Sequence, residues 1–212
     1  TARFSPFAEY IDSRRFGGAG NDAATNVVVD ALGDIIIAGG FSGEADFGGG
    51  LLRSTATSDS FIAKYSGVDG SHIWSRQLGG AIADLAIDAT GNPIVTGMFS
   101  GMVNLGGGVI TSAGSFDAFV AKYSTATGAF IWARRFGSTG SDYGRGVAVD
   151  PAGNVFVVGD FEGSVGFGGA TFASAGWSDV FVVKLSSVGL HSWSRAYGSA
   201  WNDRGSAVSA DS

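Results

Sequence analysis

The side chains that could do chemistry recur once in each of several similar segments of the chain. Histidine is the first candidate for a general base or a metal ligand, because its unperturbed pKa lies near neutrality. His72 and His191 both stand four residues before an arginine, and Phe130 holds the same position in a third segment. An aromatic strand position therefore accounts for both histidines, and we expect no catalytic residue.

The lysines and one set of aspartates recur in the same way. The three lysines occupy a single repeat position, and an aspartate stands five residues before each: Asp59 and Lys64, Asp117 and Lys122, Asp179 and Lys184. One residue type repeated in every unit is more simply structural than three active sites. We expect turn caps at strand ends and charge pairs at these positions.

Glycine-rich stretches raise the question of a phosphate-binding loop. They lie at 47–50, 105–108 and 167–169, and none is followed by Lys-Ser/Thr or opens a helical pattern. Neither a P-loop nor a dinucleotide site fits them, and they indicate turns or bulges. The chain also lacks a Gly-x-Ser-x-Gly elbow and a His-Glu-x-x-His motif, so the sequence favours a protein that is not an enzyme.

A calcium site is the remaining chemical candidate. The segment 17–22 partly matches the Gly-Gly-x-Gly-x-Asp nonapeptide of calcium-binding β-rolls. In this chain it returns only once per unit, in weaker form, which favours a turn capped by an aspartate side chain and no cofactor. If calcium does bind, its ligands are Asp22, Asp142 and Asp203, and equal melting temperatures in calcium and in chelator would contradict that hypothesis.

The elements that position these residues are strands in an internal repeat. Asp59-Ser-Phe-Ile-Ala-Lys-Tyr-Ser66 returns with small changes at 117–124 and 179–186, at separations of 58 and 62 residues. In the first unit, β-type runs cover about 26–30, 35–41, 60–65 and 72–78, with Asp-x-x-Gly-Asp/Asn hairpin turns. Trp74, Trp132 and Trp193 each close a unit, and we expect them to pack between neighbouring units.

The ordered motifs resemble a known family. Asp-x-x-Gly-Asn-Val-x-Val-x-Gly, Phe-x-Gly, Asp-x-Phe-Val-x-Lys and Trp-x-Arg-x-Phe-Gly are similar to the bacterial SBBP (seven-bladed β-propeller) repeats over nearly the whole chain. The resemblance implies an all-β propeller of four-stranded antiparallel blades, with about three and a half repeats of roughly 60 residues. It also implies a secreted or cell-surface bacterial protein, and it supplies no catalytic motif.

The repeat predicts how a single propeller domain is divided. The end of a preceding blade covers 1–16, three blades cover 17–78, 79–136 and 137–197, and the first strand of a following blade covers 198–212. An unclosed ring leaves exposed sheet edges. We therefore expect this chain to be part of a larger ring, with self-closure or pairing of two chains as alternatives, and self-association if the ring is open.

Binding residues concentrate on long loops held by a rigid scaffold. In a four-stranded blade, the connections from second to third strand and from blade to blade share one face, and we expect both to be long. Residues without a counterpart in the other units stand there: Trp177, Trp201, Tyr143, Arg145 and Arg204. A large aromatic ring in a polar loop needs a cover, either a glycan or protein ligand or a neighbouring loop.

Composition limits the remaining function classes. Thirteen basic and nineteen acidic residues give a net charge of −6, which opposes nucleic-acid binding. No apolar run is long enough to span a bilayer, and any signal peptide is expected outside this chain. The sequence thus predicts a non-catalytic scaffold that recognises glycan or protein outside the cytoplasm. The alternatives are a carbohydrate-active hydrolase or lyase and a purely structural spacer.

Overall fold

The computed structural model describes residues 2–4 and 10–211, and these residues form strands and turns without a helix. Three four-stranded antiparallel sheets follow one another along the chain. The first sheet contains β4 (Asp22–Val29), β5 (Ile35–Phe41), β8 (Asp59–Tyr65) and β9 (His72–Leu78). The second sheet contains β10 (Ala81–Ile87), β11 (Pro93–Phe99), β14 (Asp117–Tyr123) and β15 (Phe130–Phe136). The third sheet contains β16 (Asp142–Val149), β17 (Val155–Phe161), β20 (Asp179–Leu185) and β21 (His191–Tyr197).

The turns between the first two strands of each sheet form as the sequence predicts. Asp30 accepts hydrogen bonds from the amides of Leu32 and Asp34, at 2.9 and 3.0 Å, through one carboxylate oxygen. Gly33 takes a φ of +81°, a left-handed conformation that glycine adopts at little cost. A short polar side chain and a glycine therefore set the register of this antiparallel pair, which runs from Val29 opposite Ile35.

Each connection from the second to the third strand contains a small hairpin that the repeat pattern did not predict. These hairpins are β6 (Glu44–Asp46) with β7 (Leu51–Arg53), β12 (Met102–Asn104) with β13 (Val109–Thr111), and β18 (Ser164–Gly166) with β19 (Thr171–Ala173). The short β3 (Gly17–Gly18) pairs with β6. The glycine-rich stretches are the turns of these hairpins, and Gly48 and Gly50 have φ near +102° and +103°.

The connections between sheets are shorter than we expected. Residues 79–80 alone join the first sheet to the second, and residues 137–141 join the second to the third. The prediction of long connections between sheets was wrong, because β10 and β16 begin early and take up much of the spacing between units, whereas the connections from second to third strand, such as 42–58, are long as expected. This end of the sheets is thus made chiefly of hairpins. We call it the connection face, and it is formed by 42–58, 79–80, 100–116, 137–141, 162–178 and 198–203.

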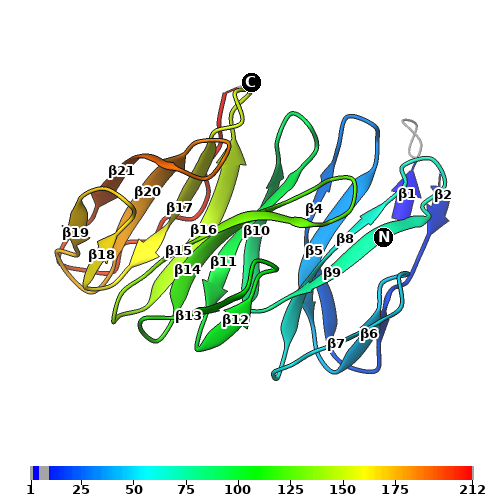
Figure 1. Cartoon of the computed structure of the whole chain (residues 1–212), viewed down its shortest axis with the longest axis horizontal. Coiled ribbons are helices and arrows are strands. Elements are labelled where there is room, and N and C mark those ends of the chain that lie inside the picture. The colour runs from blue at the N-terminus through cyan, green and yellow to red at the C-terminus, as the bar shows by residue number, and fades with distance from the viewer. Residues whose placement is uncertain (1, 5–9, 212) are drawn as a thin grey trace.

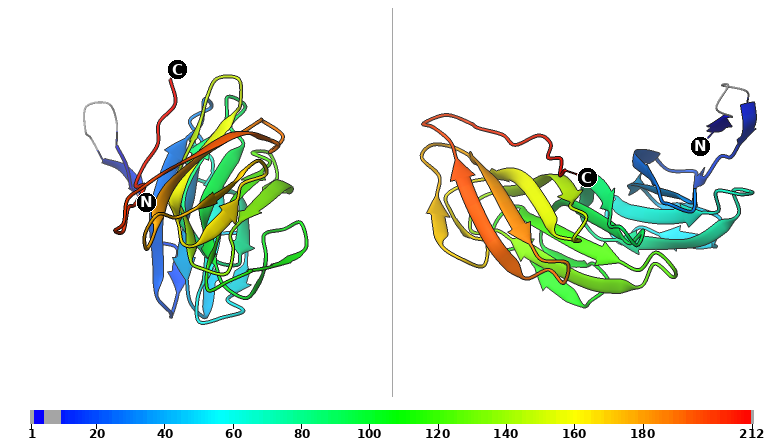
Figure 2. Two further views of the ribbon diagram at one scale, coloured as in Figure 1. Left: turned by 90° about the vertical axis from the view of Figure 1, so that its left-hand side faces the viewer. Right: turned by 90° about the horizontal axis from the view of Figure 1, so that it is seen from above.

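The three sheets stand side by side and follow a curve (Figures 1 and 2). The hairpin of β1 (Ala2–Phe4) and β2 (Tyr10–Ser13) lies beyond the first sheet, at the end of the curve opposite the third sheet. The expected blade end at 1–16 includes residues 1 and 5–9, which lie outside the described residues. Residues 203–211 lie outside the strands, and Ala207 and Val208 run against Gly146 of β16.

Apolar side chains fill the two interfaces between sheets. Trp74 and Trp132 are buried there, and their indole N–H groups donate to backbone carbonyls of the next sheet, Thr125 at 2.8 Å and Ser187 at 3.1 Å. Trp193, the matching residue of the third sheet, is 38% exposed because no further sheet covers it. The expectation that these tryptophans pack between units is confirmed for the two interfaces that the chain contains.

The described residues contain no helix that is long and apolar enough to cross a membrane, in line with the absence of an apolar run of that length in the sequence.

Candidate functional site

Two exposed tryptophans stand on neighbouring loops of the connection face of the third sheet. Trp177 is 73% exposed and Trp201 is 76% exposed. Ser178 and Asn202 form a parallel bridge, and the amide of Asp203 donates to the Ser178 carbonyl at 2.8 Å. Each tryptophan immediately precedes one residue of that bridge, so the pairing of the two loops places the backbones of both tryptophans side by side.

The backbones of these two loops touch, which limits their freedom to separate. A Cβ built on Gly176 would meet the carbonyl carbon of Ala200 at 2.4 Å, so only glycine allows this approach. In the described part of the chain, neither Trp177 nor Trp201 has an aromatic or cation–π partner. Two large apolar side chains therefore extend from neighbouring backbone positions and are left uncovered.

The other predicted binding residues are divided between internal contacts and solvent. Tyr143 stacks on Phe116 with centroids 5.8 Å apart, and the Arg145 guanidinium lies 4.6 Å from the Tyr143 ring. Arg145 also binds Asp160 at 2.7 Å, and this hydrogen bond raises the pKa of Arg145. Local packing thus accounts for Tyr143 and Arg145. Arg204 is exposed, three residues from Trp201.

The three predicted calcium ligands act as loop caps. Asp22, Asp142 and Asp203 each accept the backbone amide of the residue four positions earlier, at 2.7, 2.9 and 2.7 Å. Among the described residues, no group of three or more His, Cys, Asp or Glu side chains is arranged to hold a metal ion. Each carboxylate thereby organises its own loop.

Asp142 differs from the other two caps because it is buried beside other carboxylates. Its side chain is 1% exposed, and its Oδ1 atom has no hydrogen-bond partner in the structure. Burial raises the pKa of Asp142 to about 6, and the negative charges of Asp117 and Glu162 add to the effect. A carboxyl group at the connection face is therefore neutral in mildly acidic solution.

The lysines form charge pairs, as expected, and their partners are aspartates of the hairpin turns. Lys64, Lys122 and Lys184 bind the hairpin-turn residues Asp30, Asp88 and Asp150, at 2.8, 2.8 and 3.3 Å.

The aspartates five residues before the lysines cap loops, also as expected, as Asp59 does for the Thr55 amide at 2.8 Å. A separation of five places the two side chains on opposite faces of a strand, so the caps and the charge pairs are formed by different aspartates.

The histidines occupy aromatic strand positions, as the repeat predicts. A Cβ built on Gly49 would meet the His72 ring at 2.4 Å, and one on Gly107 would meet the Phe130 ring at the same distance. Burial lowers the pKa of His72. The imidazole and the phenyl ring thus fill the same space above a glycine turn.

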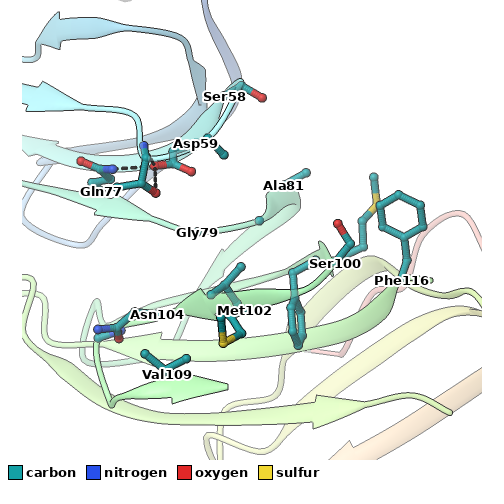
Figure 3. A pocket seen from close by; sticks show the side chains of 17 residues that line it. Ser58, Asp59, Gln77, Gly79, Ala81, Ser100, Met102, Asn104, Val109 and Phe116 are labelled. Atoms are coloured by element: carbon teal, nitrogen blue, oxygen red, sulfur yellow. Dashed lines mark hydrogen bonds between the residues drawn. The ribbon is translucent and has the colours of Figure 1, made fainter. Parts of the chain in front are cut away.

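A groove of about 800 Å³ opens between the first and second sheets at the connection face (Figure 3). Both methionines of the chain, Met98 and Met102, line it together with Phe116, and Asp59 and Gln77 form its polar side. Sequence reasoning did not predict this groove. The signal was present in the spacing, because Asp88 follows Arg76 by 12 residues where the matching separations elsewhere are 16.

Comparison with known proteins supports the repeat. Residues 131–160, which cover β15 to β17, match the family model described as a β-propeller repeat (SBBP). No curated protein matches the chain. The matched residues contain the tryptophan, the arginine and the Asp-x-x-Gly-Asn turn that carry the resemblance seen in the sequence. Residues 131–160 therefore match an SBBP β-propeller repeat, in agreement with the resemblance that the sequence motifs carry.

Proposed function

We propose that this chain is part of a β-propeller that acts as a non-catalytic binding scaffold, and that its ligand is a glycan held at Trp177 and Trp201. The observation that carries the proposal is the exposure of two indole rings on loops joined by the Ser178–Asn202 bridge. Indole rings offer broad apolar faces with a polar N–H group, which suits the alternating apolar and hydroxyl surfaces of a sugar. A protein ligand is the alternative at the same loops.

The surrounding structure supports recognition without catalysis. Glycoside hydrolysis needs two carboxylates in different environments on either side of the scissile bond. Near the tryptophans, Asp203 is engaged with the amide and hydroxyl of Ser199, at 2.7 and 3.0 Å, and Asp179 caps the Ala175 amide at 3.0 Å. These carboxylates serve loop geometry. The SBBP resemblance supports a secreted or cell-surface bacterial setting for the scaffold.

A glycan array followed by calorimetry tests the proposal. We expect a glycan hit whose affinity falls about 30-fold in Trp177→Ala and in Trp201→Ala, because a contact of hot-spot size contributes about 2 kcal/mol. Trp177→Phe keeps an aromatic face and should lose less affinity.

The matched control is Leu32→Ala, which removes an 81% exposed side chain from a β4–β5 turn at the opposite end of the sheets. Binding that survives both alanine variants would contradict the assigned site, and turnover of the bound glycan would favour a hydrolase or lyase. The absence of any glycan or protein ligand would favour a spacer.

A further inference from the structure

Among the described residues, no connecting segment pairs with the sheet edge at the groove between the first and second sheets. Between the second and third sheets, residues 137–141 lie along the edge of the preceding sheet. The amide of Ser115 donates to the Gly140 carbonyl at 3.1 Å, and the amide of Asp142 donates to the Phe116 carbonyl at 2.8 Å. Phe116 and Ser141 form a parallel bridge there.

The same pairing recurs at the end of the third sheet. Asp203 donates its amide to the Ser178 carbonyl at 2.8 Å, and Ser178 and Asn202 form the parallel bridge already described. The pairing thus occurs in two sheets, and in both the residue before the third strand, Phe116 or Ser178, offers its backbone for hydrogen bonding. In both sheets a short peptide segment binds to this backbone edge in parallel orientation.

In the first sheet, this edge consists of Thr57 and Ser58. Both residues are exposed, and within the described ranges neither takes part in a bridge of this kind. The connection 79–80 is too short to reach back along the edge, because β10 already begins at Ala81. The backbone amide of Thr57 and the carbonyl of Ser58 are therefore in the place where the other two sheets bind a peptide.

Two hollows adjoin this edge. The methionine-lined groove has a volume of about 800 Å³, and a second hollow, lined by Asn21, Thr57 and Ile82 among others, has a volume of about 770 Å³. Ser58 lines both of them. Together they provide space for the side chains of an added strand.

The wall of the groove opposite the edge is apolar and adaptable. Met102 is 76% exposed, and Val109 and Phe116 are also exposed, so the second sheet presents uncovered apolar surface there. Figure 3 shows Met102 and Val109 on the side of the groove opposite Asp59 and Gln77. Methionine is unbranched and flexible, and it adjusts to apolar side chains of different shapes.

We propose that this groove binds an extended peptide segment of a partner protein, which pairs with Thr57 and Ser58 and packs an apolar side chain against Met98, Met102 and Phe116. The bound segment donates an amide to the Ser58 carbonyl and accepts the Thr57 amide, as residues 140–142 do one sheet further along. This site is separate from the Trp177 and Trp201 loops and is independent of the glycan proposal.

Methyl NMR of the methionines tests the proposal directly. The chain has two methionines, both in the groove, so a sample with labelled methionine methyl groups gives two reporter signals. The probe is a blocked peptide with the sequence of residues 198–205, Gly-Ser-Ala-Trp-Asn-Asp-Arg-Gly, which contains a segment that pairs with such an edge in this chain. We expect both methyl signals to shift and saturate with millimolar peptide.

Two variants and one control locate the binding. Insertion of Ser-Thr-Gly-Ser between Gly79 and Gly80 restores the longer spacing and should fill the groove from within, which abolishes the shifts. Met102→Glu places a charge on an exposed side chain without disturbing the core, and we expect it to weaken binding about tenfold. Trp177→Ala lies outside the groove and should leave the titration unchanged.

Three outcomes would overturn the proposal: methyl signals that do not respond to the peptide, shifts that persist in a folded insertion variant, or shifts caused by an oligosaccharide and not by the peptide. Loss of glycan binding in Trp177→Ala with an unchanged peptide titration would separate this site from the proposed glycan site.

Discussion

Asp142 supplies the sharpest test of the electrostatics at the connection face. Its side chain is 1% exposed, burial raises its pKa to about 6, and Asp117 and Glu162 contribute further negative charge. A group whose pKa is higher in the folded state holds its proton more strongly there than in the unfolded chain. The cost of ionising it therefore lowers the free energy of unfolding as the pH rises from about 4 to about 6.

The substitution Asp142→Asn removes this cost while it keeps the loop cap. The asparagine carbonyl can still accept the Ser138 amide, which Asp142 accepts at 2.9 Å, and its NH₂ group can face the neighbouring carboxylates. The shift from 3.8 to about 6 is roughly 2 pKa units, and at about 1.36 kcal/mol per unit it corresponds to about 3 kcal/mol at pH 7. For a chain of this length that raises the melting temperature by about 6–12 °C.

Urea denaturation of the original chain and the variant at a series of pH values measures this difference. We expect Asp142→Asn to be more stable at pH 7 and the two curves to converge near pH 4. The control Asp203→Asn changes the matching cap of the following loop, which is only partly buried, and should have a small effect at every pH. A stability difference that does not depend on pH, or a variant that is less stable at pH 7, would refute the reasoning.

Two further predictions concern the interfaces between sheets. Trp132→Ala should lower the free energy of unfolding by about 3–5 kcal/mol, because it opens a cavity and removes the hydrogen bond to Ser187. Trp193→Ala should lower it much less, because Trp193 is partly exposed. Equal losses of the two variants in urea titrations would contradict this prediction. Lys122→Met leaves Asp88 buried without its partner and should cost about 3–5 kcal/mol at pH 7. Burial opposes ionisation of Asp88, but hydrogen bonds from Lys122 and from the turn that contains Asp88 lower its pKa to about 2. The loss of stability in Lys122→Met should therefore shrink as the pH falls from about 4 to 2. Acid titration of the original chain and the variant checks this prediction.

The sequence was a good guide to features that depend on local chemistry. The Asp-x-x-Gly turn depends on residues that are close together in the sequence, namely Asp30 and Gly33. Each of the four strands of a sheet likewise depends on its own short run of residues. The buried positions of Trp74 and Trp132 also follow from the repeat, because an aromatic residue at the same place in every unit indicates a shared interface.

Features that depend on pairing between distant segments were out of reach. The three-residue strands of the hairpins, such as β6 and β7, are too short to show a period in the sequence. Lys64 pairs with Asp30 and Asp34 in the turn between β4 and β5, and nothing near Lys64 in the sequence singles out Asp30, which is 34 residues away.

The exposed tryptophans were identified as exceptions to the repeat, but their juxtaposition comes from the Ser178–Asn202 bridge. The groove arises because the connection 79–80 is shorter than the connection 137–141. Its effect becomes clear only from the neighbouring interface, where the longer connection pairs with the sheet edge.

The exposed face of Trp193 has a consequence for how the chain opens. The second sheet packs against a sheet on each side, whereas the third has such a neighbour on one side. When each unit contacts only its neighbours, stability is close to a sum of unit and interface contributions, and the units at the ends fray first. Backbone amides of β11 and β14 should therefore exchange with solvent most slowly, and protection should decline toward β21.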